Sequence, residues 1–134
     1  MKNLLFIFLF FSFTNLFSQE AKVTYLRAQN ASMGVREDEN SAVSEWIVDG
    51  REVNMLVELH TTKVIIYSQK TQNYYIIKQV EQEENSWKWL CRDAEAKSCY
   101  VALRKSPDYP GFITVAVEYN DLVWFYICTH EWKN

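Results

Sequence analysis

The chain has 134 residues, 49% of them hydrophobic, with 17 acidic side chains against 14 basic ones and a formal net charge of -3. This slight acidic excess, without any block of Lys and Arg, argues against nucleic-acid binding, which depends on clustered cations. The sequence contains no internal repeat, low-complexity tract or linker. We therefore expect one domain and no nucleic-acid partner.

The first twenty residues, MKNLLFIFLFFSFTNLFSQE, have the order of a secretory signal peptide. Lys2 precedes an apolar run over residues 4–13, and a more polar stretch follows. A transmembrane anchor is the alternative, but it needs about 20 apolar residues to cross the bilayer, and this run is shorter. The leader therefore predicts export.

We place the signal peptide at residues 1–18, with cleavage after Ser18 or Gln19, and a single all-β domain at residues 19–134. Export would deliver the mature protein to the periplasm, to the outer surface or into the medium. No membrane span is expected after processing.

From Val53 onward, short runs of β-branched and aromatic residues are separated by polar clusters, a pattern typical of antiparallel β structure. Residues 29–52 lack this pattern and predict a loop that holds a short strand or a helical turn. The connections leave no room for crossover helices, so the predicted fold is an all-β antiparallel meander, a small sandwich or barrel of about seven to eight strands. The expected strands cover about 22–28, 53–60, 63–69, 73–81, 86–92, 98–105, 112–119 and 122–130.

The last two expected strands form the clearest hairpin. Asn120 and Asp121 tolerate the left-handed conformation that a two-residue turn requires. Cys128 then lies on the apolar face, where a buried free thiol is the favoured interpretation, and pairing with another chain or a nucleophilic role is the alternative. The face expected to point to the core comprises Ile113, Val115, Val117, Tyr119, Leu122, Trp124, Tyr126 and Cys128.

The stretch WLCRDAEAKSCYV carries two cysteines around a short loop. A hairpin with its loop at residues 93–97 pairs Cys91 with Cys99, within reach of a disulfide if the two form a non-hydrogen-bonded pair. In an oxidising compartment such a bond persists, so we predict a structural disulfide. A reduced buried pair, a metal site and a redox couple are the alternatives. The spacing fits neither a zinc signature nor a thioredoxin-like motif, so no metal ligand or cofactor is assigned.

The two histidines are the candidates for catalysis. His60 lies beside a predicted turn, with Glu58 two residues before it, and His130 lies at the end of the last strand. No nucleophile elbow, phosphate-binding loop or HExxH motif accompanies them. We therefore assign no catalytic residues and favour a protein that is not an enzyme.

Aromatic side chains outside the expected core are the candidates for ligand or partner contact: Tyr109, Trp46, Tyr74, Tyr75 and Trp132. Tyr109 lies in SPDYPGF, a loop rigidified by two prolines and therefore the best candidate for a recognition loop.

Three pieces of the run from Trp46 to Tyr126 carry a resemblance: KVIIYSQKTQNYYIIK, WLCRDAEAKSCYVAL and ITVAVEYNDLVWFY. In these pieces the chain resembles a group of small uncharacterised β-rich proteins exported by Bacteroidota-type bacteria. In that group the cysteine hairpin often carries a glycine in its loop, where this chain has residues 94–97, AEAK. The resemblance implies export and a β fold, and it supplies no catalytic or ligand residues.

Three functions fit the sequence. The first is an exported non-enzymatic binding or interaction module whose ligand is a protein, a glycan or a small molecule. The second is a lipocalin-like barrel that holds an apolar small molecule among its inward residues. The third is a small secreted hydrolase, which requires His60 or His130 to lie in a cleft near a nucleophile or carboxylate.

Overall fold

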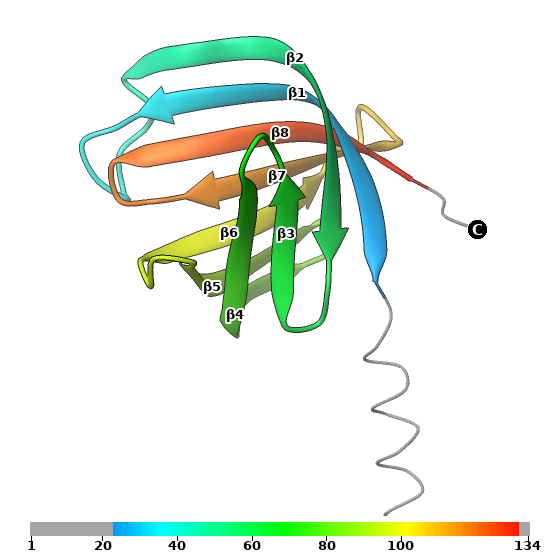
Figure 1. Cartoon of the computed structure of the whole chain (residues 1–134). Coiled ribbons are helices and arrows are strands. Elements are labelled where there is room, and N and C mark those ends of the chain that lie inside the picture. Colours follow the sequence, from blue (N-terminus) through cyan, green and yellow to red (C-terminus); the bar gives the residue numbers. More distant parts are fainter. Residues whose placement is uncertain (1–22, 132–134) are drawn as a thin grey trace, which may run out of the picture.

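The computed structural model describes residues 23–131, which form eight antiparallel strands joined in chain order into a closed barrel (Figure 1). The predicted all-β meander is confirmed. The predicted signal peptide and Trp132 lie outside the described residues, within which no helix is long and apolar enough to cross a membrane. The strands are β1 (Thr24–Val35), β2 (Glu45–Leu59), β3 (Lys63–Tyr67), β4 (Thr71–Glu83), β5 (Ser86–Asp93), β6 (Ser98–Lys105), β7 (Phe112–Glu118) and β8 (Leu122–His130).

The long hairpin of β1 and β2 differs from the sequence-based expectation of a loop over residues 29–52. Strand β1 pairs with β2 on one side and, along nearly its whole length, with β8 on the other (Figure 1). The pairing of β1 with β2 contains three register shifts, and most side chains of the first half of β2 are exposed. Bulges interrupt the two-residue alternation by which a half-buried strand is recognised, so this hairpin leaves little pattern in the sequence.

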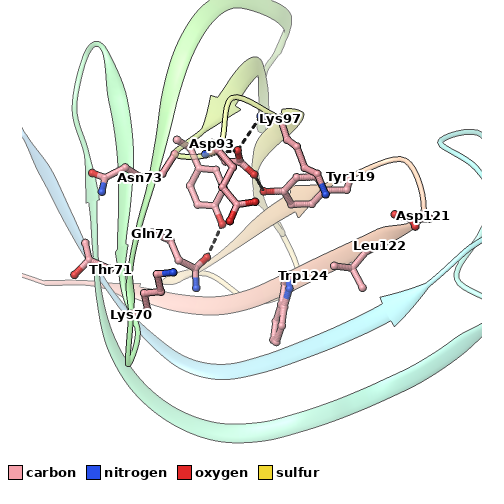
Figure 2. Close-up of a pocket in the computed structure, with 13 residues that line it drawn as sticks. Lys70, Thr71, Gln72, Asn73, Asp93, Lys97, Tyr119, Asp121, Leu122 and Trp124 are labelled. Atoms are coloured by element: carbon pink, nitrogen blue, oxygen red, sulfur yellow. Dashed lines mark hydrogen bonds between the residues drawn. The ribbon is translucent and has the colours of Figure 1, made fainter.

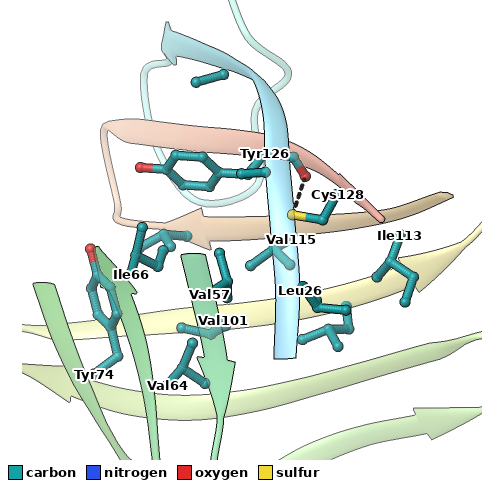
Figure 3. Close-up of a cluster of buried hydrophobic side chains, with 14 of the residues drawn as sticks. Leu26, Val57, Val64, Ile66, Tyr74, Val101, Ile113, Val115, Tyr126 and Cys128 are labelled. Carbon is teal, nitrogen blue, oxygen red and sulfur yellow. Dashed lines mark hydrogen bonds between the residues drawn. The ribbon is translucent and has the colours of Figure 1, made fainter. Parts of the chain in front are cut away.

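The inward side chains of most strands meet in one hydrophobic cluster that fills the middle of the barrel (Figure 3). The predicted register of the last hairpin is confirmed, because Ile113 pairs with Cys128 and Val115 with Tyr126. Each large aliphatic side chain buried here contributes about 1.5–3 kcal/mol through the hydrophobic effect. The largest fully buried side chains are Tyr126, Leu26, Ile66, Val57, Val64, Val101, Val115, Val117, Val123, Cys91 and Cys128.

The cysteine hairpin confirms the predicted pairing of Cys91 with Cys99 but contradicts the predicted disulfide. These two cysteines and Cys128 are all free, buried thiols. The Asp93 N–H donates to the Lys97 carbonyl at 2.9 Å, so Asp93 and Lys97 form a hydrogen-bonded pair. Hydrogen-bonded and non-hydrogen-bonded pairs alternate along an antiparallel ladder, so Cys91 and Cys99, two positions away, also form a hydrogen-bonded pair. Side chains stand farther apart in such pairs than in the non-hydrogen-bonded pairs that favour a bridge. The thiols therefore serve as small apolar groups of the core.

Burial controls the ionisation of these thiols. It raises the pKa of Cys91 to about 11 and those of Cys99 and Cys128 to about 12. Since thiols of an unfolded chain ionise near a pKa of about 8.5, only the unfolded protein carries thiolates at moderately alkaline pH.

We expect all three thiols to resist a thiol reagent at pH 8 in the native protein and to react after unfolding without a reductant. Because these pKa values are raised by folding, the stability that they contribute is complete below pH 8.5 and is lost as the pH rises towards 11–12. Thiol titration in denaturant and unfolding curves at increasing pH measure both effects. A single reactive thiol in denaturant would show that Cys91 and Cys99 are bridged.

The turn between β5 and β6 contains one strained residue, Ala96. Ala96 has a φ of 66°, in the left-handed region, and its N–H donates to the Asp93 carbonyl at 3.0 Å. The Cβ of alanine makes this conformation unfavourable by about 1–2 kcal/mol, a cost that glycine avoids.

We expect Ala96→Gly to raise the free energy of unfolding by about 0.5–1 kcal/mol, because the relief of strain exceeds the added entropy of the unfolded chain. Ala94→Gly, in the same loop but without a positive φ, is the matched control and should give no gain. Chemical denaturation of the two variants measures the difference, and equal effects would contradict it.

Candidate functional site

A cavity of about 430 Å³ lies at one end of the barrel, which we call the mouth, where three hairpin turns meet (Figure 2). Its size falls within the range of about 300–1,000 Å³ that is usual for ligand pockets. The turns are those between β3 and β4, β5 and β6, and β7 and β8. The lining residues are Lys70, Thr71, Gln72, Asn73, Tyr74, Asp93, Ala94, Glu95, Lys97, Tyr119, Asp121, Leu122 and Trp124.

The packed core ends at this cavity in a layer of polar side chains, Gln72, Tyr74, Asp93 and Tyr119, which we call the floor. Tyr74 belongs to the buried cluster, and its hydroxyl donates a hydrogen bond to the Gln72 side chain. Inward-facing positions near the strand ends thus carry side chains that are apolar along their length and polar at their tip. The floor separates the apolar interior from the solvent at the mouth.

Asp93 joins two of the hairpins through three hydrogen bonds. Its Oδ1 accepts from the backbone N–H groups of Glu95 and Lys97, both at 2.9 Å, and its Oδ2 accepts from the Tyr119 hydroxyl at 2.7 Å. Partial burial by itself would raise the pKa of the Asp93 carboxyl, but these hydrogen bonds, together with the charge of Lys97, lower the pKa overall. Asp93 is therefore a carboxylate at neutral pH, and it fixes the position of the Tyr119 ring.

The loop between β1 and β2 holds the β7–β8 turn from outside. The Arg36 guanidinium donates to the carbonyls of Tyr119 at 2.6 Å and Asn120 at 3.2 Å, and the Glu39 N–H donates to the Asn120 side chain at 3.1 Å. Tyr119 is thus held through its hydroxyl and through its backbone. Such double anchoring makes the mouth a preformed site.

The remaining floor residues form a chain of hydrogen bonds. The Tyr74 hydroxyl donates to Gln72, the Gln72 amide donates to the Ser68 hydroxyl at 2.9 Å, and that hydroxyl donates to the Lys70 carbonyl at 2.6 Å. Burial raises the pKa of Tyr74 and of Tyr119 far above the usual range for a phenol. Both phenols are therefore neutral throughout the physiological pH range.

One wall of the cavity is aromatic. The Trp124 ring stacks on the Tyr126 ring, with centroids 6.0 Å apart and planes 10° apart. Tyr126 is fully buried in the core, so the indole rests on a rigid support. Leu122 also belongs to the lining, so the cavity has apolar as well as polar walls.

Of the four candidate aromatic residues that the structure describes, Tyr74 alone lines this cavity, and at 4% exposure it is not the surface aromatic that was predicted. Tyr75, 49% exposed, is its neighbour in β4, and adjacent strand residues point to opposite faces. Trp46, 46% exposed, packs against Phe125. The structure does not bring these residues together.

The predicted recognition loop lies at the other end of the barrel. Tyr109 is 68% exposed there, and a cavity of about 300 Å³ adjoins the loop. Pro107, Pro110 and His130 contribute to its lining. This loop is therefore remote from the mouth.

Asp93, Tyr119 and Trp124 were missed as site residues, because the sequence indicated only a loop position for the first and core positions for the other two. Their common signal is location: each lies next to a turn on the inward face of the barrel. An inward residue in the middle of a strand is buried, whereas an inward residue at the strand end reaches the mouth. To separate the two kinds of inward residue, one must know which turns lie together at the same end of the barrel.

The two histidines lie away from the mouth cavity. The His60 Nε2 lies 2.9 Å from the Glu58 Oε1, but Glu58 is next to the inward-pointing Val57 and therefore faces outward. His130 lines the cavity at the end opposite the mouth. Within residues 23–131, no group of three or more His, Cys, Asp or Glu side chains is placed to hold a metal ion.

Comparisons of this chain with protein-family models, curated proteins and solved structures find no match in any of the three.

We expect the carboxylate of Asp93 to stabilise the mouth measurably. Asp93→Asn keeps the shape but removes the charge, which should lower the free energy of unfolding at pH 7 by about 1–2 kcal/mol. Because folding lowers the pKa of Asp93, its contribution is present above pH 4 and is lost as the pH falls below that value. The free energy of unfolding, measured by denaturation at several pH values, should therefore decrease less steeply with falling pH in Asp93→Asn than in the unchanged protein.

The matched control is Asp121→Asn, at an exposed residue of the same cavity. It should leave both the stability at pH 7 and the acid dependence close to those of the unchanged protein. If the two variants behave alike, the hydrogen bonds of Asp93 do not hold the mouth together.

Proposed function

We propose that this protein is an exported, non-enzymatic binding module whose ligand site is the cavity at the mouth of the barrel. The observation that carries the proposal is the combination of a cavity of about 430 Å³ with a floor fixed by internal hydrogen bonds and an aromatic wall. Such a mixture of apolar surface and a few well-placed polar groups is typical of small-molecule sites.

Export is part of the proposal and is supported by the leader-like residues 1–18. It would release the mature chain into the periplasm, onto the outer surface or into the medium. A binding module in these compartments meets ligands from outside the cell, which include glycans, small molecules and proteins.

The closed eight-stranded barrel also favours a second candidate, a lipocalin-like carrier of an apolar molecule. Against it, the inward side chains of the barrel pack into one cluster in the middle, and the cavity at the mouth has a polar floor. An apolar ligand would have to displace core residues such as Val57 and Val101. The mouth is therefore the better supported site.

A hydrolase is supported least, because neither His60 nor His130 lines the mouth cavity. The floor contains a carboxylate and two phenols, but all three are bound to other groups of the protein. They are suited to holding a ligand rather than to transferring protons.

The test is a thermal-shift screen of the mature protein against a chemically diverse library, followed by titration of each hit. We expect hits whose affinity falls about tenfold in Tyr119→Phe, since one lost hydrogen bond of about 1.4 kcal/mol corresponds to that factor. Tyr75→Phe, at an exposed tyrosine outside the cavity, is the matched control and should bind normally.

NMR chemical-shift mapping of the hits should single out the three turns of the mouth. Hits that map to another surface, or that bind Tyr119→Phe and the unchanged protein equally, would contradict the proposed site.

A further inference from the structure

The directions of the hydrogen bonds on the floor are fixed. A carboxylate can only accept, so the Tyr119 hydroxyl must donate its proton to Asp93. The Gln72 amide nitrogen donates to Ser68, which turns the amide oxygen towards Tyr74, so the Tyr74 hydroxyl donates there. Figure 2 shows Gln72, Asp93 and Tyr119 among the side chains that line the cavity. The protons of both phenols are thus already bound within the protein.

What the floor still offers to a ligand is therefore acceptor capacity. The Tyr119 hydroxyl also lies within hydrogen-bond distance of the Tyr74 hydroxyl. A phenol oxygen is an acceptor as well as a donor, and it has more than one lone pair, so acceptor capacity remains after this contact. A hydrocarbon placed there would leave buried acceptors without partners, and an anion would face lone pairs where it needs donors. A ligand group that reaches Tyr74 and Tyr119 must donate hydrogen bonds.

The rim of the cavity has balanced charges. Lys70 and Lys97 bring two ammonium groups, and Glu95 and Asp121 bring two carboxylates. All four side chains are exposed, and in the part of the chain that the structure describes none of them forms a salt bridge. The rim thus supplies both donors and acceptors without a net charge that would select an ion.

The Trp124 wall adds a flat apolar surface. Its ring is backed by Tyr126, and Leu122 lies in the same lining. A saturated sugar ring has a face of C–H groups that packs on an indole, while the hydroxyl groups at its edge donate and accept in the plane. These are the properties that the floor and the rim require.

From these contacts we infer that the mouth cavity binds a neutral saccharide, whose ring packs on Trp124 and whose hydroxyl groups donate to Tyr74 and Tyr119 and accept from Lys70 and Lys97. This inference rests on the proposed function and names the ligand class of the same site. It distinguishes the site from one for fatty acids or for anions.

The experiment uses the mature protein on an array of neutral and acidic oligosaccharides, followed by calorimetric titration of the best neutral saccharide. Free amino acids and medium-chain fatty acids are titrated in parallel. We expect binding of a neutral saccharide, with affinity at least tenfold lower for the deoxy analogue that lacks one of the hydroxyl groups directed at the floor. The deoxy series needs no protein variant, so it tests the inference even if a variant does not fold.

Trp124→Leu tests the aromatic wall, and Trp46→Leu, at an exposed tryptophan packed on the outer Phe125, is its matched control. We expect the first to weaken saccharide binding at least tenfold and the second to change it less than twofold. Circular dichroism verifies that both variants are folded.

The outcomes separate this inference from the proposed function. A ligand that binds at the mouth but is an amino acid or a fatty acid overturns the saccharide inference and leaves the proposed function standing. Saccharide binding that is equally strong in Trp124→Leu and for all deoxy analogues overturns the inference as well. If no probe binds at millimolar concentration and the library screen yields no ligand sensitive to Tyr119→Phe, both are wrong.

Discussion

The filling of the barrel by its own side chains is the constraint on which the rest of the structure depends. In a closed barrel every second residue of each strand points inward, and here these residues meet in one cluster around Val57, Val101 and Val115 (Figure 3). Cys91, Cys99 and Cys128 contribute to this core as free, buried thiols, that is, as apolar volume. Because the described inward side chains occupy its middle, an end of the barrel is the better place for a ligand site.

Polar groups can enter such a structure only where the core stops. At the mouth, Asp93 satisfies two backbone donors of its own turn and one phenol of the next hairpin, so a partly buried cluster of polar atoms is stabilised by its internal partners. The same bonds that stabilise the mouth determine what it offers to a ligand. Stability and specificity are therefore properties of one hydrogen-bond network.

Much of the fold could be predicted from the sequence. The two-residue alternation around Asn120 and Asp121 gave the register of the last hairpin, because only one register places all large apolar residues on one face. The pairing of Cys91 with Cys99 followed from placing the hairpin loop at residues 93–97. The bulged β1–β2 hairpin could not be predicted, because its bulges break the alternation and its first half of β2 is exposed.

Less of the site could be predicted. Alternation placed Tyr119 and Trp124 on the inward face, but not at the mouth. The sequence also does not indicate which pairs of the β5–β6 ladder are hydrogen-bonded, and therefore not that Cys91 and Cys99 form such a pair.

By itself, then, the sequence determined the fold class, the strand order and the inward face, because these follow from local periodicity and turn chemistry. Only the tertiary structure decided that the barrel is closed and full, and which turns meet at one end. Those features depend on how the strands tilt and pair around the barrel. Contacts between residues far apart in the chain, such as Tyr119 with Asp93, therefore define the site.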